Sequence, residues 1–142
     1  MRENDITQGI IGCAIEVHRG VGAGLLESAY EECLCFELAQ SSLKFERQVD
    51  LPVTYKGVRL DCGYRMDLVI EDLVIIEIKT VEQILKIHEV QLLSYLRLYQ
   101  KSVGLLINFN VHVLKNGVRR IVNNFKENSA SQRLCVENLL RS

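Results

Sequence analysis

Tryptophan is absent from this sequence of 142 residues, proline occurs once, and no apolar run approaches the roughly 20 residues that cross a membrane. The amino terminus, MRENDITQGIIG, has neither the basic start nor the continuous apolar core of a secretory signal. No glycine/serine tract and no long run of like charge marks a linker or a disordered tail. We therefore expect a single domain spanning residues 1–142, soluble and cytoplasmic.

The composition also gives no support for a thiolate metal site or a disulfide framework. The five cysteines form no CxxC pair and are odd in number, so we interpret most of them as small apolar core residues. With 17 basic and 18 acidic side chains, the chain lacks the charge of a protein that coats nucleic acid by bulk electrostatics. Any contact with nucleic acid must therefore be local.

Apolar residues recur at helical spacing in three parts of the chain. The pattern predicts helices over residues 5–18, from residue 26 onward, and over residues 84–100. A cluster of glycines at positions 20, 22 and 24 separates the first two of these helices. A last helix is expected over residues 131–140.

Between these helices the period shortens to two, which is typical of strands. From Phe45 onward the period changes, and alternation through Val49 and Tyr55 predicts one strand that ends at a turn of Lys56 and Gly57. Strands over residues 64–70 and 73–80 are joined by Glu71 and Asp72, which are suited to a hairpin turn.

An unbroken apolar run over residues 103–108 predicts an interior strand that is covered on both faces. Asn116 and Gly117 then predict another tight turn. The chain order is α-α-β-β-β-α-β, with room for one more strand before the final helix. This order predicts an α/β fold in which a mixed sheet is flanked by helices.

The strand LVIIEIKT carries two charges among apolar residues. Alternation places Val74, Ile76 and Ile78 on one face, so Glu77 and Lys79 project together from the other. Charged groups inside an apolar strand are costly unless they are paired or bind something.

Folding the hairpin brings Asp67 of the preceding strand near position 76 or 77, so its carboxylate can converge with that of Glu77. Together with the backbone carbonyl of Ile78, these are the hard oxygen ligands that Mg²⁺ prefers. Lys79 would stabilise charge that develops on phosphorus. The alternative is a cross-strand ion pair on a solvated face, which the apolar Ile75 on that same face disfavours.

Helical positions offer four further candidates. Glu27 follows the glycine cluster, where it either adds a functional carboxylate or is a solvated acid that favours the helix dipole. His88, Gln91 and Tyr95 share one helix face that could meet a substrate. The alternative is that Tyr95 is a core residue, Gln91 a surface amide and His88 a satisfied or exposed imidazole.

These residues resemble a known pattern. Asp67 followed by Glu77-Ile78-Lys79 is similar to the D…(D/E)xK core of the PD-(D/E)XK nuclease superfamily, although Met66 stands where the motif's name has proline. The segment GLLESAY at 24–30 resembles the signature of the GxxExxY protein family, and QLLSY at 91–95 resembles the QxxxY motif of RecB-type nucleases. The resemblance implies a restriction-endonuclease-like α-β-β-β-α-β core.

The resemblance also implies roles for individual residues. Asp67 and Glu77 would bind Mg²⁺ or Mn²⁺, Lys79 would position or activate the attacking water, and Glu27 would add a carboxylate to the metal site. Gln91 would orient Lys79 or a substrate phosphate.

Two further residues complete the implied site. Tyr95 would support the Gln91 helix face, and His88, which lies outside the minimal motif, is added as a substrate-orienting residue.

The function expected from these roles is metal-dependent hydrolysis of phosphodiester bonds in nucleic acid, with DNA the first expectation and RNA left open. The alternative is a catalytically silent domain of the same fold that binds nucleic acid or protein as a regulatory module. A homodimer is also expected, because a small chain of nearly neutral charge offers little surface for gripping a duplex.

Overall fold

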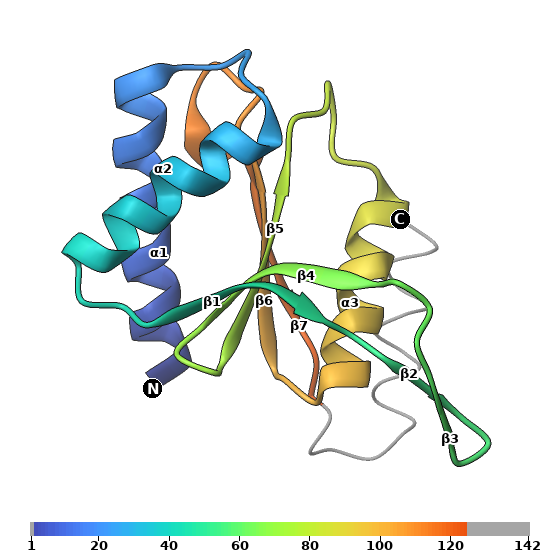
Figure 1. The fold of residues 1–142 in the computed structure, drawn as a ribbon. Coiled ribbons are helices and arrows are strands. Elements are labelled where there is room, and N and C mark those ends of the chain that lie inside the picture. The colour runs from blue at the N-terminus through green and yellow to red at the C-terminus, as the bar shows by residue number, and fades with distance from the viewer. Residues whose placement is uncertain (1, 125–142) are drawn as a thin grey trace.

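A five-stranded mixed sheet forms the centre of the molecule (Figure 1). The computed structural model describes residues 2–124. Along the sheet the strands are β1 (Phe45–Asp50), β4 (Arg65–Ile70), β5 (Val74–Lys79), β6 (Val103–Asn108) and β7 (Val118–Val122). The β5–β6 pair is parallel and the other three pairs are antiparallel. The predicted mixed sheet is therefore confirmed.

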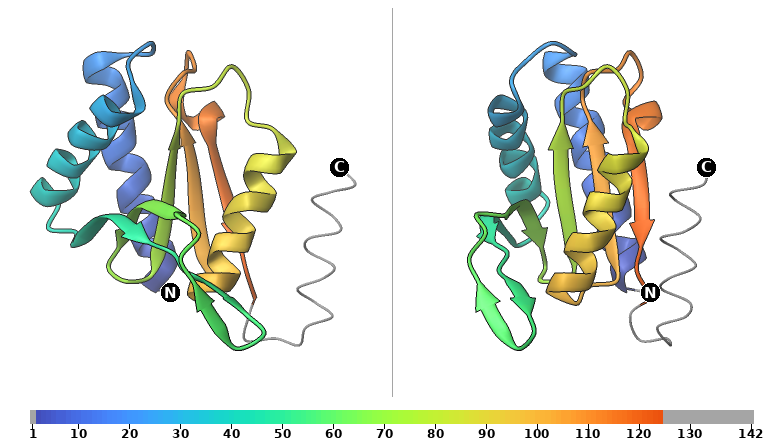
Figure 2. Two further views of the ribbon diagram at one scale, coloured as in Figure 1. Left: turned by 45° about the vertical axis from the view of Figure 1, so that its right-hand side comes forward. Right: turned by 90° about the vertical axis from the view of Figure 1, so that its right-hand side faces the viewer.

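Helices cover both faces of this sheet (Figure 2). One face packs against α1 (Arg2–Val21) and α2 (Glu27–Gln40), and the other packs against α3 (Lys86–Tyr99). The parallel pairing of β5 with β6 requires a crossover between them, and α3 provides it. The flanking helices that the chain order predicts are confirmed.

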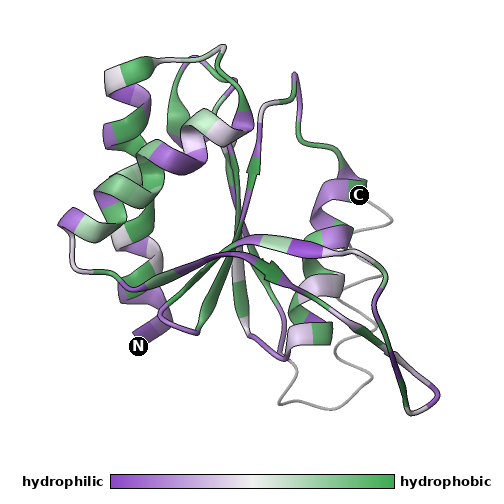
Figure 3. Ribbon diagram, in the orientation of Figure 1, coloured by the Kyte–Doolittle hydropathy of each residue, from purple (hydrophilic) through white to green (hydrophobic). Residues whose placement is uncertain are grey.

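Alternation along the central strands divides the buried residues between two cores. In β5, Val74, Ile76 and Ile78 face α1 and α2, whereas Ile75 belongs to the cluster packed against α3. The strand β6 is buried along its whole length, as expected from its continuous apolar run. Hydrophobic residues accordingly concentrate along the central strands and the helix sides that face them (Figure 3).

The first helix is longer than the predicted range of 5–18. It ends when Gly22 adopts a left-handed conformation with φ of 69° and its amide donates to the carbonyl of His18 at 2.8 Å. The second of the three glycines, rather than the first, therefore terminates the helix. No helix within residues 2–124 is both long and apolar enough to cross a membrane.

The strand predicted from Phe45 does begin there, as β1, but its continuation as a single strand to Tyr55 is wrong. Leu51 and Pro52 interrupt it, because proline has no amide hydrogen to donate to a sheet. The strand β2 (Val53–Tyr55) instead pairs with β3 (Val58–Leu60) in a separate two-stranded hairpin that projects from the body of the fold (Figure 1). The predicted turn of Lys56 and Gly57 joins these two strands.

The connection before β7 also differs from its prediction. Asn116 and Gly117 belong to a short 3₁₀ helix, η1 (Leu114–Gly117), rather than to an isolated tight turn. A side chain at Gly117 would collide with the carbonyl oxygen of Asn108, so glycine is required by packing. The helix predicted over residues 131–140 lies outside the described residues.

Candidate active site

The strands β4 and β5 separate just beyond their last paired residues, Leu68 and Ile76. Beyond this point, hydrogen bonds from backbone amides to side-chain carboxylates link the two strands. The backbone amide of Asp67 donates to Oε2 of Glu77 at 2.9 Å, and the amide of Ile78 donates to Oδ2 of Asp67 at 2.8 Å. The hairpin thus brings the two carboxylates together.

Both hairpin carboxyls are held in an environment that disfavours their charge. Burial, followed by repulsion from Asp67, raises the pKa of Glu77 to about 8, even though the Asp67 amide and Lys79 act in the opposite direction. Burial, followed by the charges of Glu31 and Glu27, raises the pKa of Asp67. A cation placed between these carboxylates would relieve both penalties.

The side chain of Glu27 joins this group from the first position of α2. It helps to line a cavity of about 370 Å³ whose walls are Glu27, Ser28, Glu31, Gln48, Asp67 and Ile78. The negative charge of Glu27 raises the pKa of both Asp67 and Glu77. A carboxylate in the first turn also interacts favourably with the helix dipole. A role in the site and a role in stabilising the helix are therefore compatible for Glu27.

Tyr30 fixes the loop that presents Glu27. Its hydroxyl donates to the carbonyl of Gly22 at 2.6 Å and accepts from the amide of Leu25 at 3.2 Å. Its ring stacks on Phe109 at a centroid distance of 4.4 Å. Within the segment at 24–30, Glu27 therefore faces the cavity while Tyr30 anchors the backbone.

Lys79 is the last residue of β5, opposite Asn108 in β6. Its positive charge lowers the pKa of Glu77, although burial outweighs this effect. Within residues 2–124, no salt bridge joins Lys79 to Asp67 or Glu77. Since Glu77 is only 8% exposed and Ile75 is fully buried, this sheet face is not a solvated ion-pair surface.

The helix α3 contributes Tyr95 to the opposite side of the hairpin. Tyr95 is 7% exposed, and its ring meets that of Tyr64 edge to face at 5.9 Å. Burial, then the charge of Glu77, raises the pKa of Tyr95. Tyr95 is therefore both a core residue and a neighbour of the acidic pair.

The other two candidates on α3 are less closely connected to the hairpin. Gln91 is exposed one turn before Tyr95. The Nδ1 atom of His88 accepts from the amide of Leu85 at 2.9 Å, which caps the start of α3. In the described part of the chain, no hydrogen bond links Gln91 or His88 to Asp67, Glu77 or Lys79.

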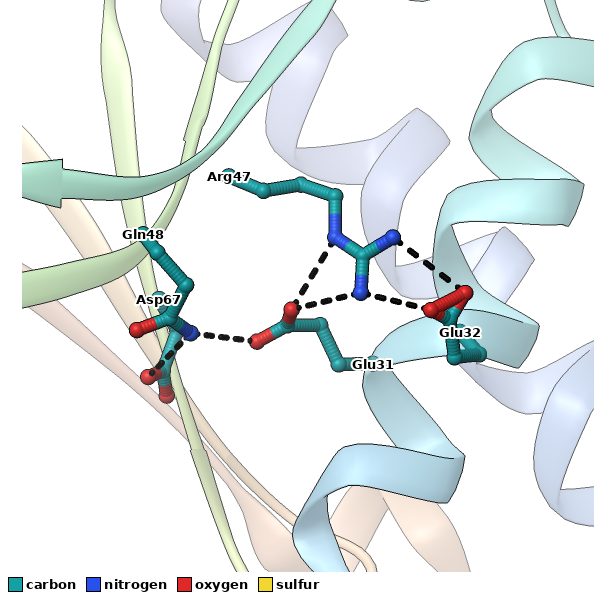
Figure 4. Close-up of polar contacts among 5 residues, drawn as sticks. All are labelled: Glu31, Glu32, Arg47, Gln48 and Asp67. Atoms are coloured by element: carbon teal, nitrogen blue, oxygen red, sulfur yellow. Dashed lines mark hydrogen bonds and ion pairs between the residues drawn. The ribbon is translucent and has the colours of Figure 1, made fainter.

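Three residues near the cavity escaped the sequence analysis: Glu31, Arg47 and Gln48. Hydrogen bonds connect them to one another and to Asp67 (Figure 4). The spacing of Glu31 four positions after Glu27 is a signal that could have found it, because residues four apart share a helix face. Nothing in the strand pattern distinguishes Arg47 or Gln48.

The donor set around the hairpin fits a hard divalent cation in its chemistry. Asp67 and Glu77 are acceptor-only when ionised, and each uses one oxygen on a backbone amide. Within residues 2–124, however, no three acidic, histidine or cysteine side chains are grouped closely enough to hold a metal by themselves. Two carboxylates would therefore need completion by a backbone carbonyl, such as that of Ile78, and by water.

A mixed sheet between helices, with two carboxylates meeting where its central hairpin diverges, defines a restriction-endonuclease-like fold. The chain belongs to the PD-(D/E)XK nuclease superfamily, whose family model matches residues 4–121.

Comparison with solved structures supports the same fold. The crystal structure of SSO0001 is similar with a TM-score of 0.54 and 20% sequence identity. The similarity covers 81% of this chain and 58% of the SSO0001 chain, so this chain spans little more than half of that protein. A search of curated proteins found no match.

Proposed function

We propose that this protein is a nuclease that hydrolyses phosphodiester bonds with the help of Mg²⁺ or Mn²⁺. The observation that carries the proposal is the convergence of Asp67 and Glu77, each with one oxygen anchored on a backbone amide. Membership of the PD-(D/E)XK nuclease superfamily supports it.

The residues have distinct parts in this reaction. Asp67 and Glu77 would hold the ion together with the carbonyl of Ile78 and water. The carboxylate of Glu27, at the cavity wall, would join them once the ion is bound, since among the described residues these three carboxylates are not grouped closely enough without it. When bound, a divalent ion polarises the phosphodiester and lowers the pKa of a bound water. The ammonium of Lys79, beside Glu77 at the end of β5, would position that water and stabilise negative charge on phosphorus.

The helix α3 would form the second wall of the site. Gln91 is exposed one turn before Tyr95, and its amide would orient a substrate phosphate or Lys79. Tyr95 would support this face from its buried position against Tyr64. His88, already used as a cap, would orient substrate through its other ring nitrogen.

We further propose that the chain belongs to the GxxExxY branch and carries the RecB-like QxxxY motif. The first assignment is supported by the different roles of two motif residues. Glu27 lines the cavity, and Tyr30 anchors the loop before it. The placement of Gln91 and Tyr95 on one face of α3 supports the second. We take nucleic acid, with DNA ahead of RNA, as the substrate and a homodimer as the assembly.

The decisive experiment is a cleavage assay. Purified protein with Mg²⁺ or Mn²⁺ should cut at least one substrate among single-stranded, duplex and branched DNA and RNA. Lys79→Ala should lower the rate by roughly 100-fold or more, because a group that stabilises developing charge is removed. The control Lys115→Ala, an exposed lysine in η1, should cut like the wild type. Equal background from the wild type and Lys79→Ala defeats the proposal.

A second candidate is a catalytically silent module that binds nucleic acid or protein. It is favoured by the lack, within residues 2–124, of three grouped metal-binding side chains. Calorimetry with Mn²⁺ separates the two candidates. Heat that depends on both Asp67 and Glu77 supports the nuclease, whereas its absence supports the silent module.

A further inference from the structure

Gln48 has an unusual backbone conformation next to the candidate metal site. It lies in β1, where Arg47 pairs with Leu68 and Val49 pairs with Met66, so Gln48 is opposite Asp67. The β1–β4 register is the same before and after Gln48, so neither strand contains an inserted residue at this point. The φ of Gln48 is nevertheless 50°, a left-handed value that is rare for a non-glycine residue inside a strand.

This conformation turns two successive side chains toward the same partner. In a regular strand Arg47 and Gln48 would point to opposite faces. Here both donate to Glu31 of α2: Nε of Arg47 to Oε2 at 3.0 Å, and Nε2 of Gln48 to Oε1 at 2.8 Å. The amide of Gln48 thus lies between Glu31 and Asp67 (Figure 4), where Gln48 helps to line the cavity.

Glu31 is engaged on both of its oxygens. A second nitrogen of Arg47, Nη2, also donates to Oε2 at 2.9 Å, and the same guanidinium bonds Glu32 at 2.7 Å. Glu31 is 8% exposed, and the Arg47 guanidinium supplies the opposite charge beside it. Glu31 is therefore an anchor for Gln48 rather than a ligand available to a cation.

The anchored amide faces Asp67. Nε2 of Gln48 lies 3.5 Å from Oδ1 of Asp67, while Oδ2 of the same carboxylate accepts from the amide of Ile78 at 2.8 Å. The carboxylate thus has a neighbour on each side, from β1 and from β5. The contact on Oδ1 is longer than the hydrogen bond on Oδ2, so it adds a weaker preference for one orientation of the carboxyl group.

We propose that Gln48, held by Glu31 and Arg47, is a positioning residue that orients the carboxylate of Asp67. The inference rests on the proposed function in giving Asp67 the role of metal ligand. Gln48 does not touch the reacting atoms, and its effect passes through Asp67. Its removal should therefore alter how Asp67 binds an ion more than how the protein binds nucleic acid.

The variant Gln48→Gly tests this directly, because glycine keeps a positive φ without strain and lacks only the amide side chain. The chain offers a closely matched control in Gln100, an exposed glutamine that caps α3 with φ of 58°. Gln100→Gly makes the same chemical change at a residue with a similar positive φ. Any difference between the two variants therefore reports the surroundings of Gln48.

Three measurements define the expected result. The carboxyl carbon NMR shift of Asp67 in metal-free protein should move in Gln48→Gly and stay in place in Gln100→Gly. The dissociation constant for Mn²⁺ should rise about 10-fold or more in Gln48→Gly, as is typical when a partner of a metal ligand is lost. The rate at saturating nucleic acid should fall with little change in KM.

The outcomes distinguish this inference from the proposed function. A wild type that neither binds Mn²⁺ nor cuts nucleic acid removes the proposed function, yet the Asp67 shift still decides whether Gln48 orients that carboxylate. An unchanged shift in Gln48→Gly overturns the inference. The inference is also overturned if Gln48→Gly is less thermally stable than Gln100→Gly but binds Mn²⁺ with unchanged affinity. In that case Gln48 would only join β1 to α2.

Discussion

Asp67 and Glu77 each accept a hydrogen bond from a backbone amide of the opposite strand, where β4 and β5 are no longer paired. The amide of Asp67 donates to the Glu77 carboxylate, and the amide of Ile78 donates to the Asp67 carboxylate. The same two side chains that are suited to a metal therefore also close the end of the hairpin. Their effects on stability and on activity can be separated, because a neutral amide still accepts a hydrogen bond but binds a divalent cation poorly.

Glu77→Gln should stabilise the metal-free protein at about pH 8 while abolishing metal-dependent activity. The substitution keeps an acceptor for the Asp67 amide and removes the repulsion between the two carboxylates. We expect a gain of about 1 kcal/mol, or roughly 4 °C in thermal midpoint. Calorimetry can measure this gain. Glu82→Gln, an exposed acid, is the control, and a midpoint that falls in Glu77→Gln contradicts the expectation.

The stability of the metal-free protein should decline as the pH rises from about 4.5 to about 8. The folded state raises the pKa of Glu77 from 4.5 to about 8, so in this range the folded protein keeps a proton that the unfolded chain releases. The contribution is complete below pH 4.5 and is lost as the pH passes through the folded pKa. Urea unfolding over this range measures it, and Glu77→Gln should show a shallower decline.

Added Mn²⁺ should reverse that trend. Because binding requires ionised carboxylates, the stabilisation by Mn²⁺ should increase with pH over the same interval. The measurement is the change in unfolding midpoint at fixed Mn²⁺ concentration. An equal stabilisation at about pH 5 and pH 8 would argue against Glu77 as a ligand.

Tyr30→Phe should weaken the loop that presents Glu27. The substitution keeps the ring stacked on Phe109 but removes the hydrogen bonds to Gly22 and Leu25. We expect a loss of about 1–3 kcal/mol, since two backbone groups lose their partner, together with lower activity. Urea unfolding and the cleavage assay measure the two effects. The exposed Tyr55 supplies the control Tyr55→Phe, which should alter neither.

His88→Ala distinguishes a structural from a substrate-orienting role. Loss of the bond from the Leu85 amide should cost about 1 kcal/mol, as for other helix caps. If His88 also orients substrate, the KM for nucleic acid should rise in a variant that is still fully folded. A lower unfolding midpoint with unchanged kinetics would restrict His88 to its role as a cap.

Much of the fold was predictable because periodicity is a local property of the backbone. The alternation that buried Ile75 and Ile76 on opposite faces, and the continuous run that became β6, both follow from strand geometry. The prediction failed where a single residue overrode the pattern. Pro52 divided one expected strand into two, and Gly117, which packs against the Asn108 carbonyl, lies in a 3₁₀ helix instead of an isolated turn.

The sequence by itself determined the central hairpin, since the spacing of Asp67, Glu77 and Lys79 about a short turn leaves little choice in which strands they occupy. Only the tertiary structure decided what surrounds it. Glu31 meets Arg47 and Gln48 across more than a dozen positions because α2 packs beside β1, and Gln48 reaches Asp67 through a left-handed backbone. Contacts of this kind depend on how elements dock, which no local period encodes.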